Sequence, residues 1–91
     1  EVTTDNKPIY RIQLGVFRNK LNEDKLSAFS IVTSQEINEK GLTKYFEGAY
    51  STYKDAFANL SRVKENGFAG AFIVAFLKEK QIKLSEAQKL E

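Results

Sequence analysis

Two parts of this chain resemble each other, and this repeat constrains the fold more than any other feature of the sequence. Residues 10–17 (YRIQLGVF) and residues 43–50 (TKYFEGAY) both end in a glycine, one further residue and an aromatic residue. A second matching pair, AFSIV at 28–32 and AFIV at 71–74, follows them along the chain. The repeat indicates two halves, each made of a strand, a crossover and a strand, with the first crossover much the shorter.

Two such halves predict an α+β fold of the order βαββαβ. When right-handed crossovers interleave the halves, the product is a ferredoxin-like two-layer sandwich, with a four-stranded antiparallel sheet and helices on one face only. The first and third strands, which carry the matching segments, are then expected side by side in the middle of the sheet.

Hydrophobic alternation assigns the two faces of the first strand. Apolar and other residues alternate through residues 9–17, which is typical of a strand with one buried face. The residues expected in the core are Tyr10, Ile12, Leu14 and Val16. The opposite, open face is expected to carry Arg11, Gln13, Gly15 and Phe17.

The other elements follow from β-branched content, turn residues and helical spacing. Strands are expected over 29–37, 42–50 and 69–77, the last covered on both faces, with a turn at 38–41 and a short terminal strand within 78–84. Residues 18–28 could form one or two helical turns or an irregular crossover. The clearest helix begins after Thr52, a suitable N-cap, and its expected apolar stripe is Tyr53, Ala56, Phe57, Leu60 and Val63.

Composition narrows the possible functions. The 91 residues suffice for one domain, expected over 9–88 between a linker at 1–8 and a tail at 89–91 that could come from a vector. Without Cys or His, the chain lacks the thiolate and imidazole groups of zinc sites and of Ser-His or Cys-His nucleophiles. A net charge of +2 is too small to attract nucleic acid without a local basic patch. We therefore expect a non-catalytic module without a cofactor.

The two matching strands predict a binding site on the open face of the sheet. A carbohydrate receptor needs flat rings that stack on the C–H faces of sugars and amides that bond their hydroxyl and acetamido groups. Glycines let an extended ligand approach the backbone, and cations could meet a carboxylate. The candidate residues are Arg11, Gln13, Gly15, Phe17, Lys44, Phe46, Gly48 and Tyr50. β-bulges at the glycines and packing of the rings under loops stay open as alternative explanations.

The same segments give a family resemblance. The first strand, the third strand ending YFEGAY, the helix entry STYKDAF and the segment NGFAGAFIVAF resemble the SPOR domain, a peptidoglycan-binding module of bacterial cell-envelope proteins. The residues that fit its aromatic-x-x-Gln-x-Gly-x-Phe strand are Tyr10, Gln13, Gly15 and Phe17, with Gly48 and Tyr50 in a second copy. The resemblance implies binding, without cleavage, of glycan strands that lack stem peptides. It also implies a monomeric domain of an envelope-anchored parent protein, in the periplasm or cell envelope of a bacterium, with a link to cell division.

Two other functions fit the same fold. An RNA recognition motif also presents aromatic residues on the open face of a βαββαβ sheet, and residues 66–76 imitate its signature. Here, however, that segment follows the long helix and lacks the leading basic residue. A protein-interaction module would instead pair through an exposed edge strand, for which residues 31–37 are suited.

Overall fold

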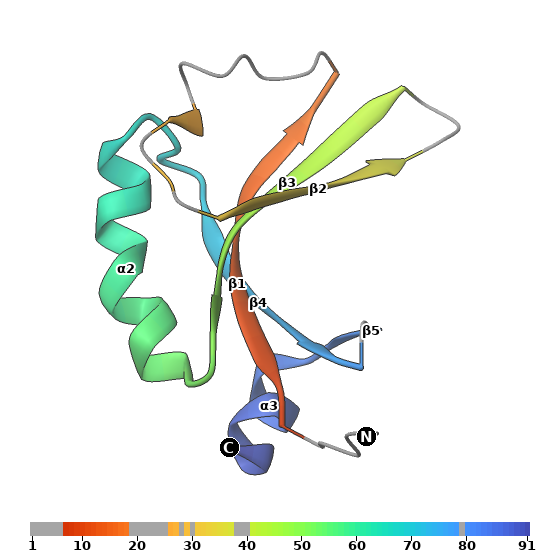
Figure 1. Ribbon diagram of the computed structural model, residues 1–91, viewed down its shortest axis with the longest axis vertical. Helices are drawn as coiled ribbons and strands as arrows, with labels where there is room; N and C mark the ends of the chain where they lie inside the picture. Colours follow the sequence, from red (N-terminus) through yellow and green to blue (C-terminus); the bar gives the residue numbers. More distant parts are fainter. Residues whose placement is uncertain (1–6, 19–25, 28, 30, 38–40, 79) are drawn as a thin grey trace.

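The structure is a computed structural model that describes residues 7–18, 26–27, 29, 31–37, 41–78 and 80–91. Its elements are β1 (Ile9–Phe17), β2 (Val32–Ile37), β3 (Leu42–Tyr50), α2 (Tyr53–Glu65), β4 (Phe72–Leu77), β5 (Lys80–Ile82) and α3 (Leu84–Leu90). The strands form one antiparallel sheet in the order β2-β3-β1-β4-β5 (Figure 1). The α+β class is confirmed, and β1 and β3 are neighbours as the repeat predicted. The expected crossover at 18–28 falls largely outside the described residues.

The sheet has five strands instead of the four predicted. β5 extends the edge beyond β4, with Ala75 opposite Ile82 and Leu77 opposite Lys80. Lys78, with a positive φ of 51°, lies in the turn between the two strands. Ile82 is half-buried and packs against the core, so the added strand contributes apolar surface. The short terminal strand expected within 78–84 is thus confirmed, but it joins the main sheet.

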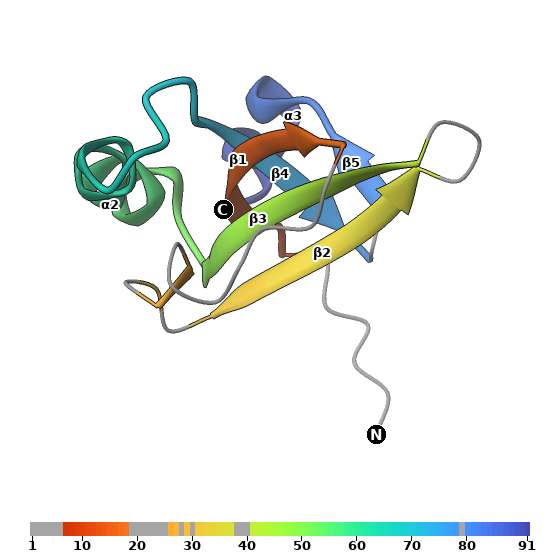
Figure 2. The ribbon, with the colours of Figure 1, turned by 90° about the horizontal axis from the view of Figure 1, so that it is seen from above.

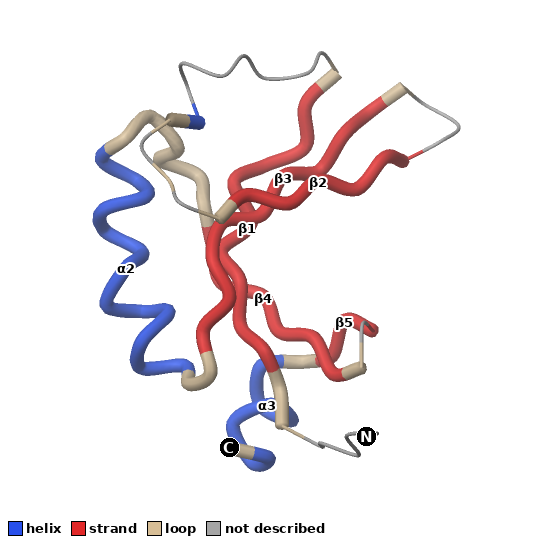
Figure 3. The backbone as a smooth tube through the Cα atoms, in the orientation of Figure 1, coloured by secondary structure: helices blue, strands red, loops and turns tan. Residues whose placement is uncertain are grey.

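One face of the sheet packs against the helices. Figure 2 shows α2 to one side of the strands, and Figure 3 shows the β2–β3 and β4–β5 pairs diverging as the sheet curls. The buried core of this face includes Tyr10, Ile12, Leu14, Tyr45, Ile73 and Ala75 from the strands and Ala56, Val63 and Ala87 from the helices. Because α2 and α3 share this core, the prediction of helices on one face holds for the described part of the chain.

A β-bulge at Gly15 interrupts the alternation of β1. Gln13 lies opposite Phe46, but the register then shifts and Gly15, with a φ of 148°, lies opposite Tyr45. A bulge sets two residues of one strand against one of its partner, so Leu14 and Gly15 both belong to the helix-covered side. Every later residue of β1 therefore faces opposite to the predicted direction.

This shift reverses the predicted facing of the last two residues of β1. Val16, expected in the core, is 42% exposed and lies opposite Lys44. Phe17, expected on the open face, packs against the core, with its ring centroid 6.0 Å from that of Tyr45 and 6.3 Å from that of Phe68. The predicted facing was right for the residues before the bulge and wrong for these two.

Helix α2 begins where the sequence predicts. The side chain of Thr52 caps it by accepting a hydrogen bond of 3.1 Å from the backbone N–H of Asp55. Ala56 and Val63 are fully buried, whereas Phe57 is 60% exposed, so its expected burial was wrong. At 3.6 residues per turn, Phe57 lies nearly a third of a turn away from the line through Ala56 and Val63.

Strand β4 was predicted to be covered on both faces, and its open side is covered only in part: Val74 is 4% exposed, whereas Phe72 is not covered. Ile73 and Ala75 belong to the core shared with the helices. Phe72 lies on the other face and is 50% exposed. Both faces of β4 carry apolar residues, so its sequence has no alternation that could have distinguished them.

Candidate functional site

The sheet face turned away from the helices carries aromatic rings beside polar side chains. Cross-strand pairing puts Gln13 between Phe46 on β3 and Phe72 on β4. Arg11 lies opposite Val74 on the same side. We call this surface the open face, and its main residues are Arg11, Gln13, Val16, Lys44, Phe46, Phe72, Val74 and Phe76.

An open cavity of about 250 Å³ lies on the open face. Its lining residues are Arg11, Thr33, Ser34, Gln35, Phe46 and Phe76. The rings of Phe46 and Phe76 meet edge to face, with centroids 5.5 Å apart and an interplanar angle of 89°. The described lining therefore combines a cation, an amide, the hydroxyl of Thr33 and two rings, without an acidic side chain.

Arg11 brings to this cavity a cation that forms no ion pair with any residue that the structure describes. Its guanidinium carbon lies 5.2 Å from the ring centroid of Phe76, within the range of a cation–π interaction. Its Nε is buried, and no described residue accepts a hydrogen bond from it. A buried donor without an acceptor costs about 1–3 kcal/mol. A carboxylate that reached the guanidinium would offset this cost with a charge-assisted hydrogen bond.

Gln13 and Lys44 complete the polar part of the open face. Gln13 is only 9% exposed, and its amide can both donate and accept hydrogen bonds beside the ring of Phe46. Lys44 is half-buried and lies opposite Val16 on one side and Gln35 on the other. Of the eight predicted site residues, the structure thus brings four together on this face: Arg11, Gln13, Lys44 and Phe46.

The other four predicted residues lie on the helix-covered side, so their placement on the open face was wrong. A Cβ atom at Gly15 would lie 3.0 Å from Cζ of Phe17, and one at Gly48 would lie 2.7 Å from Cζ of Tyr50. The register of β3 against β1 also shifts between Tyr50 and Glu47, next to Gly48. Each Gly-x-aromatic segment is therefore a bulge whose ring folds over its own glycine.

Tyr50 is held by a partly buried ion pair between the sheet and α2. Its hydroxyl donates a hydrogen bond of 2.8 Å to Glu47, and Arg62 donates one of 3.1 Å to the other oxygen of that carboxylate. Burial and the adjacent Glu47 carboxylate raise the pKa of Tyr50 to about 12. The hydrogen bond to Glu47 likewise raises the pKa of Arg62. Glu47 thus joins the strand to the helix, a role that the sequence did not reveal.

Sequence reasoning missed the contribution of β4 and β2 to the open face. Phe72 and Phe76 come from a strand that was expected to be covered on both sides. Thr33 and Gln35 come from the edge strand β2, where they lie opposite Phe46 and Lys44. Both faces of β2 carry polar residues, Thr33 and Gln35 on one and Ser34 and Glu36 on the other. The sequence pattern therefore could not predict which pair belongs to the open face.

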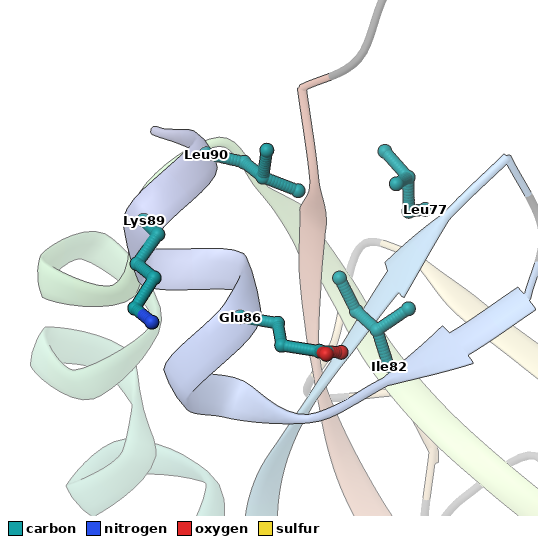
Figure 4. Close-up of a pocket in the computed structure, with 5 residues that line it drawn as sticks. All are labelled: Leu77, Ile82, Glu86, Lys89 and Leu90. Carbon is teal, nitrogen blue, oxygen red and sulfur yellow. The ribbon is translucent and has the colours of Figure 1, made fainter.

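A second cavity, of about 440 Å³, lies between α3 and the β4–β5 pair (Figure 4). Its described lining is aliphatic, with two charged residues: Leu77, Ile82, Glu86, Lys89 and Leu90. Leu90 extends from α3 toward Leu77 (Figure 4). This cavity has neither ring nor amide in that lining, so it offers no stacking surface for a sugar.

Comparison with protein-family models, curated proteins and solved structures finds no match for this chain. Neither helix in the described part of the chain has the length and apolar character of a membrane span. No group of three or more acidic side chains suited to a metal ion occurs among the described residues. A functional assignment therefore depends on the chemistry of the open face.

Proposed function

We propose that this chain is a non-catalytic module that binds peptidoglycan glycan strands lacking stem peptides on its open face. The observation that carries the proposal is the guanidinium of Arg11, which lies on the ring of Phe76, lines the cavity and has a buried Nε without a hydrogen-bond partner among the described residues. When a stem peptide is removed, the lactyl group of the sugar becomes a free carboxylate. Guanidinium groups bind carboxylates with two parallel hydrogen bonds.

The rest of the open face suits the remaining parts of such a polymer. The half-buried ring of Phe76 offers apolar surface to the C–H faces of sugars, and Phe46, which is almost fully buried, supports that ring edge to face. The amides of Gln13 and Gln35 and the hydroxyl of Thr33 offer donors and acceptors to hydroxyl and acetamido groups. In this proposal Arg11, Gln13, Lys44 and Phe46 contact the glycan. The two Gly-x-aromatic bulges instead shape the strands that carry them.

The proposal includes a ferredoxin-like core and membership of the SPOR family. The order β2-β3-β1-β4 is the one that two interleaved βαβ halves produce, and β5 is added at its edge. Under this proposal, the chain is a monomeric domain of an envelope-anchored protein in a bacterial periplasm or cell envelope. It needs no cofactor, because binding involves no bond cleavage.

Replacing Arg11 tests the proposed site. Arg11→Gln removes the guanidinium, and we expect its affinity for amidase-treated peptidoglycan to fall at least about tenfold. Lys64→Gln on α2 removes the same charge from an exposed position on the helix, so it controls for general attraction to an anionic wall. Co-sedimentation with amidase-treated and untreated peptidoglycan measures both variants, with their thermal unfolding as a check on the fold.

Three outcomes of this experiment distinguish the proposal from its rivals. Selective recovery of wild type and Lys64→Gln with treated peptidoglycan, and its loss in Arg11→Gln, would support it. Equal losses of binding in Arg11→Gln and Lys64→Gln would show that the protein binds peptidoglycan through its net charge alone. Equal recovery with untreated peptidoglycan would mean that the module does not recognise strands freed of stem peptides.

A further inference from the structure

Phe72 stands apart from the other aromatic residues of the open face. Its side chain is 50% exposed, whereas Phe46 is only 4% exposed. It lies opposite Gln13 on β1, at the start of β4. No aromatic ring among the described residues contacts it, in contrast to Phe46 and Phe76, which contact each other. The ring of Phe72 is therefore available for a ligand.

Its position separates Phe72 from the cavity that Arg11 lines. Phe72 and Phe76 lie on the same side of β4, four residues apart. At a strand rise of about 3.3 Å per residue, their Cα atoms are about 13 Å apart. One sugar ring cannot contact both, whereas a chain of sugars can, and Gln13 lies opposite Phe72 for hydrogen bonding. Val16, 42% exposed, adds apolar surface on the same face.

A single exposed phenylalanine is not by itself informative, as Phe57 illustrates. Phe57 is 60% exposed on α2, but its ring stacks on that of Tyr53 at an interplanar angle of 24°. Phe57 is also remote from the polar side chains of the open face, since it belongs to a helix that packs on the opposite side. Phe72 differs in both respects, because it has a free ring and a neighbouring buried amide.

We infer that Phe72 is a second sugar-stacking platform, which makes the open face selective for glycans long enough to reach from the Arg11 cavity to the start of β4. This inference rests on the proposed function and adds that the site selects glycans by their length. The cavity binds one part of the glycan, and Phe72 adds affinity only when the chain continues past Gln13.

The test compares Phe72→Ala with Phe57→Ala, a matched control on the helix layer. Binding of a stem-peptide-free disaccharide and octasaccharide is measured by calorimetry. We expect Phe72→Ala to weaken octasaccharide binding about tenfold and disaccharide binding less than about twofold. Phe57→Ala should leave both unchanged. Phe72→Tyr, which keeps the ring, should bind like wild type, whereas Phe72→Leu should behave like Phe72→Ala.

Each contrary outcome overturns a different claim. If Phe72→Ala binds the octasaccharide like Phe57→Ala, the second platform is refuted while the proposed function stands. If Phe72→Ala weakens both ligands equally, Phe72 belongs to the first site and does not select length. If wild type binds neither oligosaccharide, the proposed function itself fails, and the inference fails with it.

Discussion

At the scale of single residues, two glycines determine which side chains reach each face of the sheet. Gly15 and Gly48 have φ values of 148° and 81°, a region that residues with a Cβ rarely adopt. The aromatic ring two residues later occupies the space that a Cβ would need. Each bulge thus turns an aromatic residue toward the core, and the repeat seen in the sequence is a repeat of this local structure.

Gly48→Ala should therefore destabilise the protein by about 2–5 kcal/mol. The unfavourable φ costs about 1–2 kcal/mol, and displacement of the Tyr50 ring costs about 1–3 kcal/mol more. Gly41→Ala is the matched control, because Gly41 has a φ of 65° but no atom within 4 Å of the added Cβ. Urea unfolding of both variants measures the difference. Equal losses of stability in the two variants would show that the ring of Tyr50 moves aside at no cost in free energy.

At the scale of elements, Glu91 links the end of α3 to the rest of the fold by hydrogen bonds. The Glu91 carboxylate accepts hydrogen bonds of 2.6 Å from the Tyr10 hydroxyl and 2.8 Å from the backbone N–H of Tyr53. It thereby joins α3 to β1 and to the first turn of α2. The hydrogen bond from Tyr10, followed by that from Tyr53, lowers the pKa of Glu91, whereas burial and Glu91 raise the pKa of Tyr10.

This contact predicts a pH-dependent stability. Because the pKa of Glu91 is lower in the folded state, its contribution is present above the unfolded value of 4.5 and is lost as the pH falls through the folded value. Wild type should therefore unfold at a higher temperature than Glu91→Ala near about pH 6, and the gap should close toward about pH 3. Thermal unfolding followed by circular dichroism across this range measures the gap.

A matched acidic variant controls for the loss of negative charge. Glu36→Ala removes an exposed carboxylate from the edge strand β2. The difference in unfolding temperature between Glu36→Ala and wild type should not shrink as the pH falls, in contrast to the difference expected for Glu91→Ala. A gap for Glu91→Ala that stays constant down to low pH would contradict the role of the ionised carboxylate.

At the scale of the whole molecule, the charge balance argues against a nucleic acid as the ligand. The net charge is only +2, and Arg62, one of the cations, is paired with Glu47. Binding of single-stranded RNA on an open sheet face requires several phosphate contacts and therefore depends steeply on salt. Glycan binding through rings, amides and one carboxylate contact releases few counterions.

The salt dependence of the affinity therefore distinguishes glycan binding from RNA binding. Between about 50 and 200 mM salt, affinity for a stem-peptide-free glycan should fall less than about fivefold, while a protein with six or more phosphate contacts loses about a thousandfold. Fluorescence titration with the glycan and with a uridine oligonucleotide measures both slopes. Tight, steeply salt-dependent binding of the oligonucleotide would favour the RNA-binding alternative.

The sequence by itself determined the α+β class, the positions of most strands, the start of α2 and the adjacency of β1 and β3. These properties depend on local signals, namely alternation, a Thr cap and an internal repeat, which the chain carries whatever its partners. It also led to four of the residues of the open face, because alternation holds in β1 as far as Gln13.

Only the tertiary structure decided which side the later residues face. A bulge moves the alternation by one residue, and whether a glycine forms one depends on the register of the neighbouring strand. For that reason Phe17 and Tyr50 turned out to be packing residues, while Phe72 and Phe76 came to the open face from a strand without alternation. The pairing of Glu47 with Arg62 likewise required a helix and a strand to meet, which no local pattern records.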